Sequence, residues 1–232
     1  APTEIYTLSL HDALPISISP LNADVFSGAP SSGKTSLLRV MQRLGFSVVG
    51  EVARAHFESQ ILAGYEPEEI LADQVRFNRE IFRLALLRES NLVPGQRYLL
   101  DRGVPDSIAY HRLYGVPVEE VIRHCRSIRY RQVFLLDRLP VQGDGMRVEG
   151  EQEADRLDEL LEQAYRETEH EVIRVPVGTL RFRAAFVLSH MPEAGIALPA
   201  DGDPLYAAAT MLDQRAASAS ESMSSIASTN VS

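Results

Sequence analysis

The chain is poor in cysteine and in positive charge. Its only cysteine is Cys125, so an internal disulfide framework is excluded. It carries 23 basic residues against 32 acidic ones, which leaves a net charge of −9 at pH 7. A surface that binds nucleic acid or an anionic membrane requires positive charge, so we expect neither partner.

Long apolar runs and zinc-binding spacings are also missing. No apolar run reaches the roughly 18 residues of a membrane-spanning helix, and no basic segment leads into an apolar stretch at the start. We therefore expect a cytoplasmic protein. The six histidines occur at no spacing typical of zinc ligands, so we expect no histidine metal site.

Lysine is almost absent, and the one exception is informative. Lys34 is the only lysine, and every other basic side chain is an arginine. This bias most simply reflects genomic composition. Lys34 lies in the run Gly28-Ala29-Pro30-Ser31-Ser32-Gly33-Lys34-Thr35, which fits the phosphate-binding pattern G-x-x-x-x-G-K-S/T. A compact ammonium on a flexible stem suits phosphates better than a planar guanidinium does.

Each part of this loop has a chemical role. Small residues let backbone N–H groups surround the phosphates, Lys34 reaches the β and γ oxygens, and Thr35 ligates Mg²⁺. Ala23 to Ser27 has the composition of a short strand, and Ser36 to Leu44 has apolar residues at helical spacing. The loop thus precedes a helix N-terminus whose dipole favours anions, so Gly28 to Ser36 are predicted to bind a nucleotide. An ordinary glycine-rich turn is the alternative.

A second element of the same kind is Tyr98-Leu99-Leu100-Asp101. An apolar run that ends in aspartate, downstream of a phosphate-binding loop, is typical of the Walker B strand, whose carboxylate lies beside Mg²⁺. We predict that Thr35 and Asp101 hold the metal ion directly or through water. Arg102-Gly103 makes the element more specific, and Arg102 is predicted to clamp the acceptor or a phosphate.

Glu51 follows another predicted strand, Phe46 to Val49. Ligands of open α/β sheets bind at the carboxyl ends of the strands, so this carboxylate can orient an acceptor hydroxyl or take its proton. A solvated surface glutamate is the alternative. Ala53 to Leu92 is predicted to form two helices, interrupted at Gly64 and restarted at Pro67, as an insert over the acceptor site.

The loop from Arg138 to Gly150 contains the predicted lid residue. An arginine that folds over the γ-phosphate from a mobile loop accelerates phosphoryl transfer by orders of magnitude, and Arg147 is the first candidate and Arg138 the second. A surface loop with incidental arginines is the alternative. The later loop that begins with Pro176 lies where related folds hold the nucleotide base.

Strand and helix patterns alternate along the chain. Strands are expected at 23–27, 46–49, 98–101, 133–136 and 171–175, with further helices at 105–115, 117–127, 151–168 and 180–188. This alternation predicts a three-layer α/β fold with helices on both faces of a parallel five-stranded sheet, and the strand order 2-3-1-4-5. Cys125 is expected in the core rather than as a nucleophile.

The two ends of the chain differ from this middle part. Residues 1–17 resemble a translated sequencing adapter and are predicted to be a non-native leader without a fold, with a genuine amphipathic leader as the alternative. Residues 191–232 are rich in Ala and Ser and poor in aromatic side chains, so we expect them to be disordered. Residues 18–190 then form the single folded domain.

From about Ala23 to Leu188 the chain resembles a family of small P-loop proteins labelled AAA-domain proteins or predicted ATPases. That family is similar to nucleoside and nucleotide kinases and to the ribosylnicotinamide-kinase part of bacterial NAD-regulator proteins. The resemblance is carried by Gly28 to Thr35, Glu51 with Arg54, Asp101 to Ser107 with Tyr110, Asp144 with Arg147, and Val175-Pro176 with Arg181.

Two positions depart from the related patterns. Ser31 stands where the family usually has Gly, and Gly103 stands where deoxynucleoside kinases have Ser. The sequence contains no second P-loop and no C-terminal helical lid domain, so a hexameric ring motor is not expected.

These residues together predict a phosphotransferase. The γ-phosphoryl group of Mg²⁺-bound ATP, or of GTP, would pass to a small nucleoside- or nucleotide-like acceptor, with Lys34 stabilising phosphate charge, Glu51 positioning the acceptor and Arg147 covering the transferring group. The alternative is a regulatory ATPase or GTPase switch whose insert binds a protein partner. A nucleotide-binding remnant without turnover is a third reading, which the joint presence of Lys34, Thr35 and Asp101 disfavours.

Overall fold

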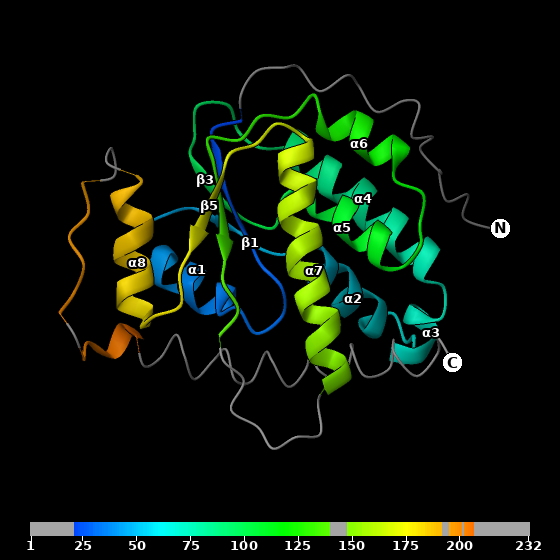
Figure 1. The fold of residues 1–232 in the computed structure, drawn as a ribbon, viewed down its shortest axis with the longest axis horizontal. Helices are drawn as coiled ribbons and strands as arrows, with labels where there is room; N and C mark the ends of the chain where they lie inside the picture. The colour runs from blue at the N-terminus through cyan, green and yellow to red at the C-terminus, as the bar shows by residue number, and fades with distance from the viewer. Residues whose placement is uncertain (1–20, 140–147, 192–194, 201, 207–232) are drawn as a thin grey trace.

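One parallel sheet forms the centre of the molecule. The computed structural model describes residues 21–139, 148–191, 195–200 and 202–206. Its five strands lie in the order β2-β3-β1-β4-β5 and all pair in parallel (Figure 1), which confirms the predicted order. They are β1 (Ala23–Ser27), β2 (Val48–Val49), β3 (Tyr98–Asp101), β4 (Gln132–Leu136) and β5 (Val172–Val175).

Helices cover both faces of the sheet, as predicted (Figure 1). They are α1 (Lys34–Arg43), α2 (Val52–Leu62), α3 (Pro67–Leu71), α4 (Gln74–Ser90), α5 (Asp106–Leu113), α6 (Glu119–Cys125), α7 (Val148–Glu167) and α8 (Leu180–Ser189). Successive strand residues point to opposite faces. On β4, Val133 and Leu135 therefore belong to a core shared with α4, α5 and α7, whereas Phe134 and Leu136 belong to one shared with α1 and α8.

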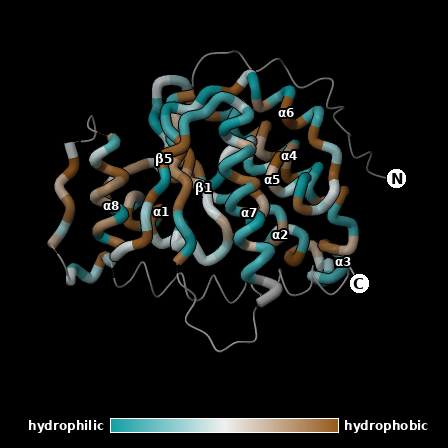
Figure 2. Tube along the Cα trace, viewed as in Figure 1, coloured by the Kyte–Doolittle hydropathy of each residue, from teal (hydrophilic) through white to brown (hydrophobic). Residues whose placement is uncertain are grey.

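The central strand is buried along its whole length. All residues of β1 are buried, and the tube in Figure 2 shows hydrophobic residues concentrated on the central strands, whereas the helices carry both hydrophobic and hydrophilic residues. Cys125 is fully buried in the same core, and burial raises the pKa of its thiol well above the usual value, as expected of a packing residue. In the parallel register Phe26 pairs with Asp101, so the carboxyl ends of β1 and β3 meet at one edge.

The insert between β2 and β3 has three helices, so the prediction of two was wrong. The interruption at Gly64 and the restart at Pro67 are present, but α3 ends at Leu71 and a new helix starts at Gln74. The Asp73 carboxylate caps α4 by accepting a hydrogen bond from the Arg76 N–H at 2.8 Å. This aspartate, a preferred N-cap residue, divides what the apolar periodicity suggested was one helix.

Part of the predicted disordered tail packs on the domain. Leu198, Leu205 and Tyr206 lie against the core shared by α1 and α8, and Arg43 of α1 donates to the Leu205 carbonyl at 3.3 Å. A few apolar side chains are sufficient here because the helices offer a surface to cover, which composition cannot reveal. The predicted leader lies outside the described residues. Within the described part of the chain, no helix has the length and apolar character needed to cross a membrane.

Candidate active site

The phosphate-binding loop connects β1 to α1. Gly33, the N-cap residue of α1, has a φ of 73°, and Ser31 has a φ of 61°. Both angles lie in the left-handed region, which is unfavourable for a residue with a Cβ atom. The positive φ at Ser31 is the physical reason why the family that the chain resembles usually has glycine at this position. A Cβ atom at Gly28 would lie 3.1 Å from the Leu136 carbonyl oxygen of β4, so this glycine allows close packing.

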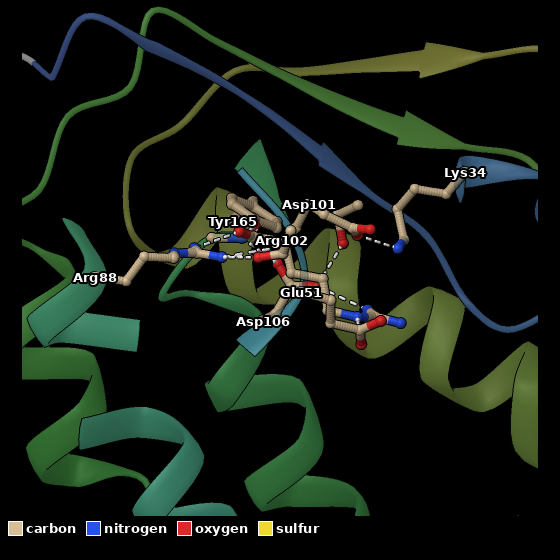
Figure 3. Close-up of polar contacts among 10 residues, drawn as sticks. Lys34, Glu51, Arg88, Asp101, Arg102, Asp106 and Tyr165 are labelled. Carbon is tan, nitrogen blue, oxygen red and sulfur yellow. Dashed lines mark hydrogen bonds and ion pairs between the residues drawn. The ribbon is translucent and has the colours of Figure 1, made fainter. Parts of the chain in front are cut away.

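Lys34 and Asp101 form an ion pair at the carboxyl ends of the central strands (Figure 3). The two residues are only 6% and 7% exposed. Thr35 follows Lys34 in the first turn of α1 and is partly buried, and Ser36 beyond it is buried. The structure thus places the predicted phosphate-binding ammonium against the predicted metal-binding carboxylate.

Glu51 is the N-cap residue of α2 and is paired with Arg102 (Figure 3). The Glu51 Oε1 atom accepts from Arg102 Nε at 2.8 Å, and the guanidinium carbon lies 5.1 Å from the centroid of the Tyr110 ring. Burial alone would raise the pKa of Glu51, but the positive charges of Arg102 and Lys34 outweigh it and lower the pKa to about 2. The Glu51 carboxylate is therefore ionised at neutral pH and can accept a hydrogen bond.

An arginine that sequence reasoning missed holds the turn after β3. Arg88 of α4 donates to the carbonyl oxygens of Gly50 at 3.3 Å, Asp101 at 3.2 Å and Arg102 at 2.6 Å. Arg102 has a φ of 65°, which costs about 1–2 kcal/mol for a residue with a Cβ atom. Arg88 offsets this strain and links the ends of β2 and β3. No sequence pattern could have found Arg88, because a buried arginine on a helix cannot be told from a solvent-exposed one by the sequence alone.

Asp106 is the centre of a buried network beneath the same turn. Its carboxylate accepts hydrogen bonds from Ser27 Oγ at 2.7 Å, Arg102 Nη1 at 2.9 Å and the Gly103 N–H at 3.1 Å, and from the Tyr165 hydroxyl. These donors come from β1, from the turn and from α7. The network therefore fixes the start of the phosphate-binding loop relative to Arg102.

The packing around Gly103 explains why serine is absent there. A Cβ atom would lie 2.9 Å from the Tyr130 hydroxyl and 3.0 Å from the Tyr165 hydroxyl. Both hydroxyls are engaged, since Tyr130 donates to Glu89 at 2.7 Å and Tyr165 donates to Asp106. This departure from the deoxynucleoside kinase pattern therefore follows from two buried tyrosines that lie far away in the sequence.

The remaining predicted residues lie near the same edge or outside the description. Pro176 directly follows β5. Arg138, the second lid candidate, pairs with Asp155 of α7. Arg147 and Asp144 lie outside the described residues, so the lid remains a prediction. Among the residues that the structure describes, no group of three or more His, Cys, Asp or Glu side chains is arranged to hold a metal ion.

Comparison with known proteins agrees with this architecture. A model of an AAA-domain family matches residues 24–183. A NadR protein in complex with NR is similar in structure, with a TM-score of 0.54 and 16% identity over 77% of this chain and 52% of that one. A NadR protein in complex with NAD and AMP-PNP has a TM-score of 0.50 and 16% identity, over 77% and 51% of the two chains.

A thymidylate kinase from Ehrlichia chaffeensis has a TM-score of 0.46 and 14% identity, with 75% of this chain and 99% of the kinase covered. The chain spans about half the length of the NadR chains. At such identities these likenesses describe the fold alone. A search of curated protein sequences finds no match.

Proposed function

Since the chain belongs to the AAA-domain family, we propose that it is a P-loop phosphotransferase that passes the γ-phosphoryl group of ATP, or of GTP, to a small nucleoside- or nucleotide-like acceptor. The observation that carries the proposal is the convergence of Lys34, Asp101, Glu51 and Arg102 at one edge of the sheet. The similar NadR structure that holds AMP-PNP supports ATP as the donor.

The oxygen donors at this edge fit Mg²⁺. The Thr35 hydroxyl and the Asp101 carboxylate are hard donors, and Mg²⁺ commonly takes one or two protein oxygens and completes its shell with water and phosphate oxygens. The lack of a larger acidic cluster among the described residues is consistent with a site of this kind. When bound, the ion would neutralise charge on the β- and γ-phosphates.

The residues of the chain would orient and stabilise the transfer. Lys34 and the loop N–H groups would stabilise charge on the γ-phosphoryl oxygens. The acceptor oxygen forms a bond to the γ-phosphorus while the bond from this phosphorus to the β–γ bridging oxygen breaks, and ADP leaves. Glu51 stays ionised with a pKa of about 2, so it would accept a hydrogen bond from the acceptor hydroxyl and orient it. The hydroxyl proton passes to water as the new bond to phosphorus forms.

Arg102 would bind the acceptor beside Glu51. Its guanidinium is fixed by Glu51 and Asp106, so its position is set before the acceptor arrives. Arg147 is proposed to cover the transferring group from the loop before α7. Full transfer activity in an Arg147→Ala variant would contradict that role, and an Arg138→Ala variant tests the second candidate in parallel.

Detection of a phosphorylated product by mass spectrometry tests the proposal. The full chain is incubated with Mg²⁺, ATP or GTP, and a panel of nucleosides, nucleotides and ribosylnicotinamide. A product that is absent with a Lys34→Ala variant would support the phosphotransferase and identify its acceptor. The absence of both product formation and nucleotide loss in the wild-type protein would overturn it.

A nucleotide-dependent switch that binds a protein partner is the second candidate. The observation in its favour is that the end of α2 and the turn after it carry exposed apolar side chains, since Leu62 is 89% and Tyr65 is 53% exposed. Exposed apolar groups at one place are typical of interaction sites. Nucleotide hydrolysis without a phosphorylated acceptor in the same assay would favour this function.

A further inference from the structure

Arg183 of α8 is a buried arginine behind the phosphate-binding loop. It is 2% exposed. Its guanidinium donates to the carbonyl oxygen of Ser32 in the loop, to that of Asp137 after β4 at 3.0 Å, and to that of Val175 in β5 at 3.3 Å. One side chain, 151 residues along the chain from Ser32, therefore ties the loop to the ends of two strands.

The contact with Ser32 fixes the orientation of one peptide group. In a trans peptide the carbonyl of one residue and the N–H of the next point in opposite directions, and no cis peptide is present in the described chain. Holding the Ser32 carbonyl toward Arg183 therefore directs the Gly33 N–H away from α8. In a loop of this sequence pattern, that N–H is one of the donors that surround a phosphate.

The guanidinium also packs directly on the loop. A Cβ atom at Gly33 would lie 3.2 Å from Arg183 Nη1 and 3.1 Å from Leu139 Cδ1. Glycine is the residue most free to rotate its peptide groups, and Gly33 already has a φ of 73°. Without an external brace, the Ser32–Gly33 peptide can therefore change its orientation more easily than a peptide between two residues that carry side chains.

The charge of Arg183 is not matched by a carboxylate within hydrogen-bonding distance in the described chain. Its partners there are main-chain carbonyls, and the nearby Asp137 carboxylate pairs with Arg174 at 3.1 Å. A guanidinium stays protonated in proteins. A buried cation without an anionic partner is costly, and an anion placed nearby lowers that cost. The adjoining loop is where the polyphosphate would bind.

We propose that Arg183 is a positioning residue for the nucleotide phosphates. It holds the Ser32–Gly33 peptide with its N–H toward the phosphates, and it adds a second fixed positive charge to the one supplied by Lys34. The inference rests on the proposed function, because it concerns the same nucleotide site. No local pattern indicates it, since the loop motif ends at Thr35.

Isothermal titration of ATP into full-length variants at 10 °C tests the inference. Arg183→Met removes the charge and the hydrogen bonds while it retains an unbranched apolar side chain. We expect the Kd for ATP to rise about tenfold to a hundredfold, the range for loss of a charge-assisted contact. Arg183→Lys retains the charge without the planar guanidinium, so its Kd for ATP should lie between those of wild type and Arg183→Met.

The matched control is Arg129→Met, before the N-terminal end of β4 and away from the phosphate-binding loop. Arg129 donates to the main-chain carbonyls of Arg126 at 2.7 Å and Ile128 at 2.8 Å, so the Kd of this variant for ATP should stay within about twofold of wild type. Inorganic triphosphate serves as a second probe. Because it contacts only the phosphate site, it should lose affinity in Arg183→Met as ATP does, an effect that general weakening of the fold does not produce in a protein that is still folded.

The outcomes separate this inference from the proposed function. If wild type binds neither ATP nor GTP, the proposed function fails. If wild type binds ATP and a folded Arg183→Met variant binds it equally well, the inference is wrong while the proposed function stands. If circular dichroism shows that neither Arg183 variant folds at 10 °C, Arg183 is a brace of the fold and the positioning role is rejected.

Discussion

Replacing Gly103 with alanine tests the packing of the turn that carries Arg102. The new Cβ atom would lie 2.9 Å from the Tyr130 hydroxyl and 3.0 Å from the Tyr165 hydroxyl. Both rings are buried, so neither can move aside freely. Overpacking of this kind costs about 1–3 kcal/mol. Displacing the hydrogen bond from the Gly103 N–H to Tyr165, which is 3.2 Å long, adds about 1 kcal/mol.

We therefore expect Gly103→Ala to lower the free energy of unfolding by about 2–4 kcal/mol. Urea denaturation followed by circular dichroism measures this quantity directly. The clash with Tyr165 is isolated by a double-mutant cycle with Tyr165→Phe, which removes the hydroxyl that the Cβ atom would meet. The double variant should be less destabilised than the sum of the single variants, by about 1 kcal/mol.

Gly50→Ala is the matched control, because a Cβ atom at Gly50 meets no atom within 4 Å. Its free energy of unfolding should stay within about 0.5 kcal/mol of wild type. The reasoning is refuted if Gly103→Ala is as mild as this control. Strict additivity in the cycle would show that the Tyr165 hydroxyl is not the obstacle.

Three further predictions follow from the site and its surroundings. Glu51→Gln should lower kcat about a hundredfold in the transfer assay while the Kd for ATP changes by less than about threefold, because the Glu51 side chain hydrogen-bonds to Arg102 rather than to the phosphate-binding loop. An equal loss of ATP affinity would contradict the assignment of Glu51 to the acceptor. Arg88→Met leaves the buried Glu89 without its ion partner and should lower the free energy of unfolding, measured by urea titration, by about 3 kcal/mol. The control is Arg83→Met on the same helix. The ion pair of Arg83 is about one-third exposed, so its loss should lower the free energy of unfolding by less than about 1 kcal/mol. Burial, aided by the Arg129 charge, lowers the pKa of His170 to about 4, so the unfolded chain binds a proton between pH 6.5 and 4 that the folded chain does not. Stability should therefore fall by up to about 3 kcal/mol as the pH falls through this window, and His170→Phe should flatten the fall.

Local patterns in the sequence were sufficient to predict the order of the strands in the sheet and the position of the phosphate-binding loop. An apolar run that ends in Asp101, placed after a loop with Lys34 and Thr35, predicts two adjacent strands, because Thr35 and Asp101 are predicted to hold the same metal ion. The observed order β2-β3-β1-β4-β5 agrees with that requirement. The same reasoning brought Glu51 to the edge where the structure pairs it with Arg102.

Periodicity was a poorer guide where packing decides the outcome. The apolar stripe of the insert continues through Asp73, yet this residue caps a new helix. In the segment after α8, Leu198 and Leu205 pack on the core although the composition around them is typical of disorder. In both cases the deciding term is a neighbouring surface or a single cap, and neither is visible in an average over a sequence window.

What the sequence by itself determined is the set of groups proposed to bind the nucleotide, since a phosphate-binding loop and a strand-terminal carboxylate are local features. Only the tertiary structure decided what holds them. Arg88 clamps the turn after β3, Asp106 and Tyr165 anchor it from beneath, and Arg183 braces the loop from α8. These contacts join residues that lie far apart in the chain, and a buried side chain that donates to a distant carbonyl has no local spacing by which a sequence pattern can reveal it.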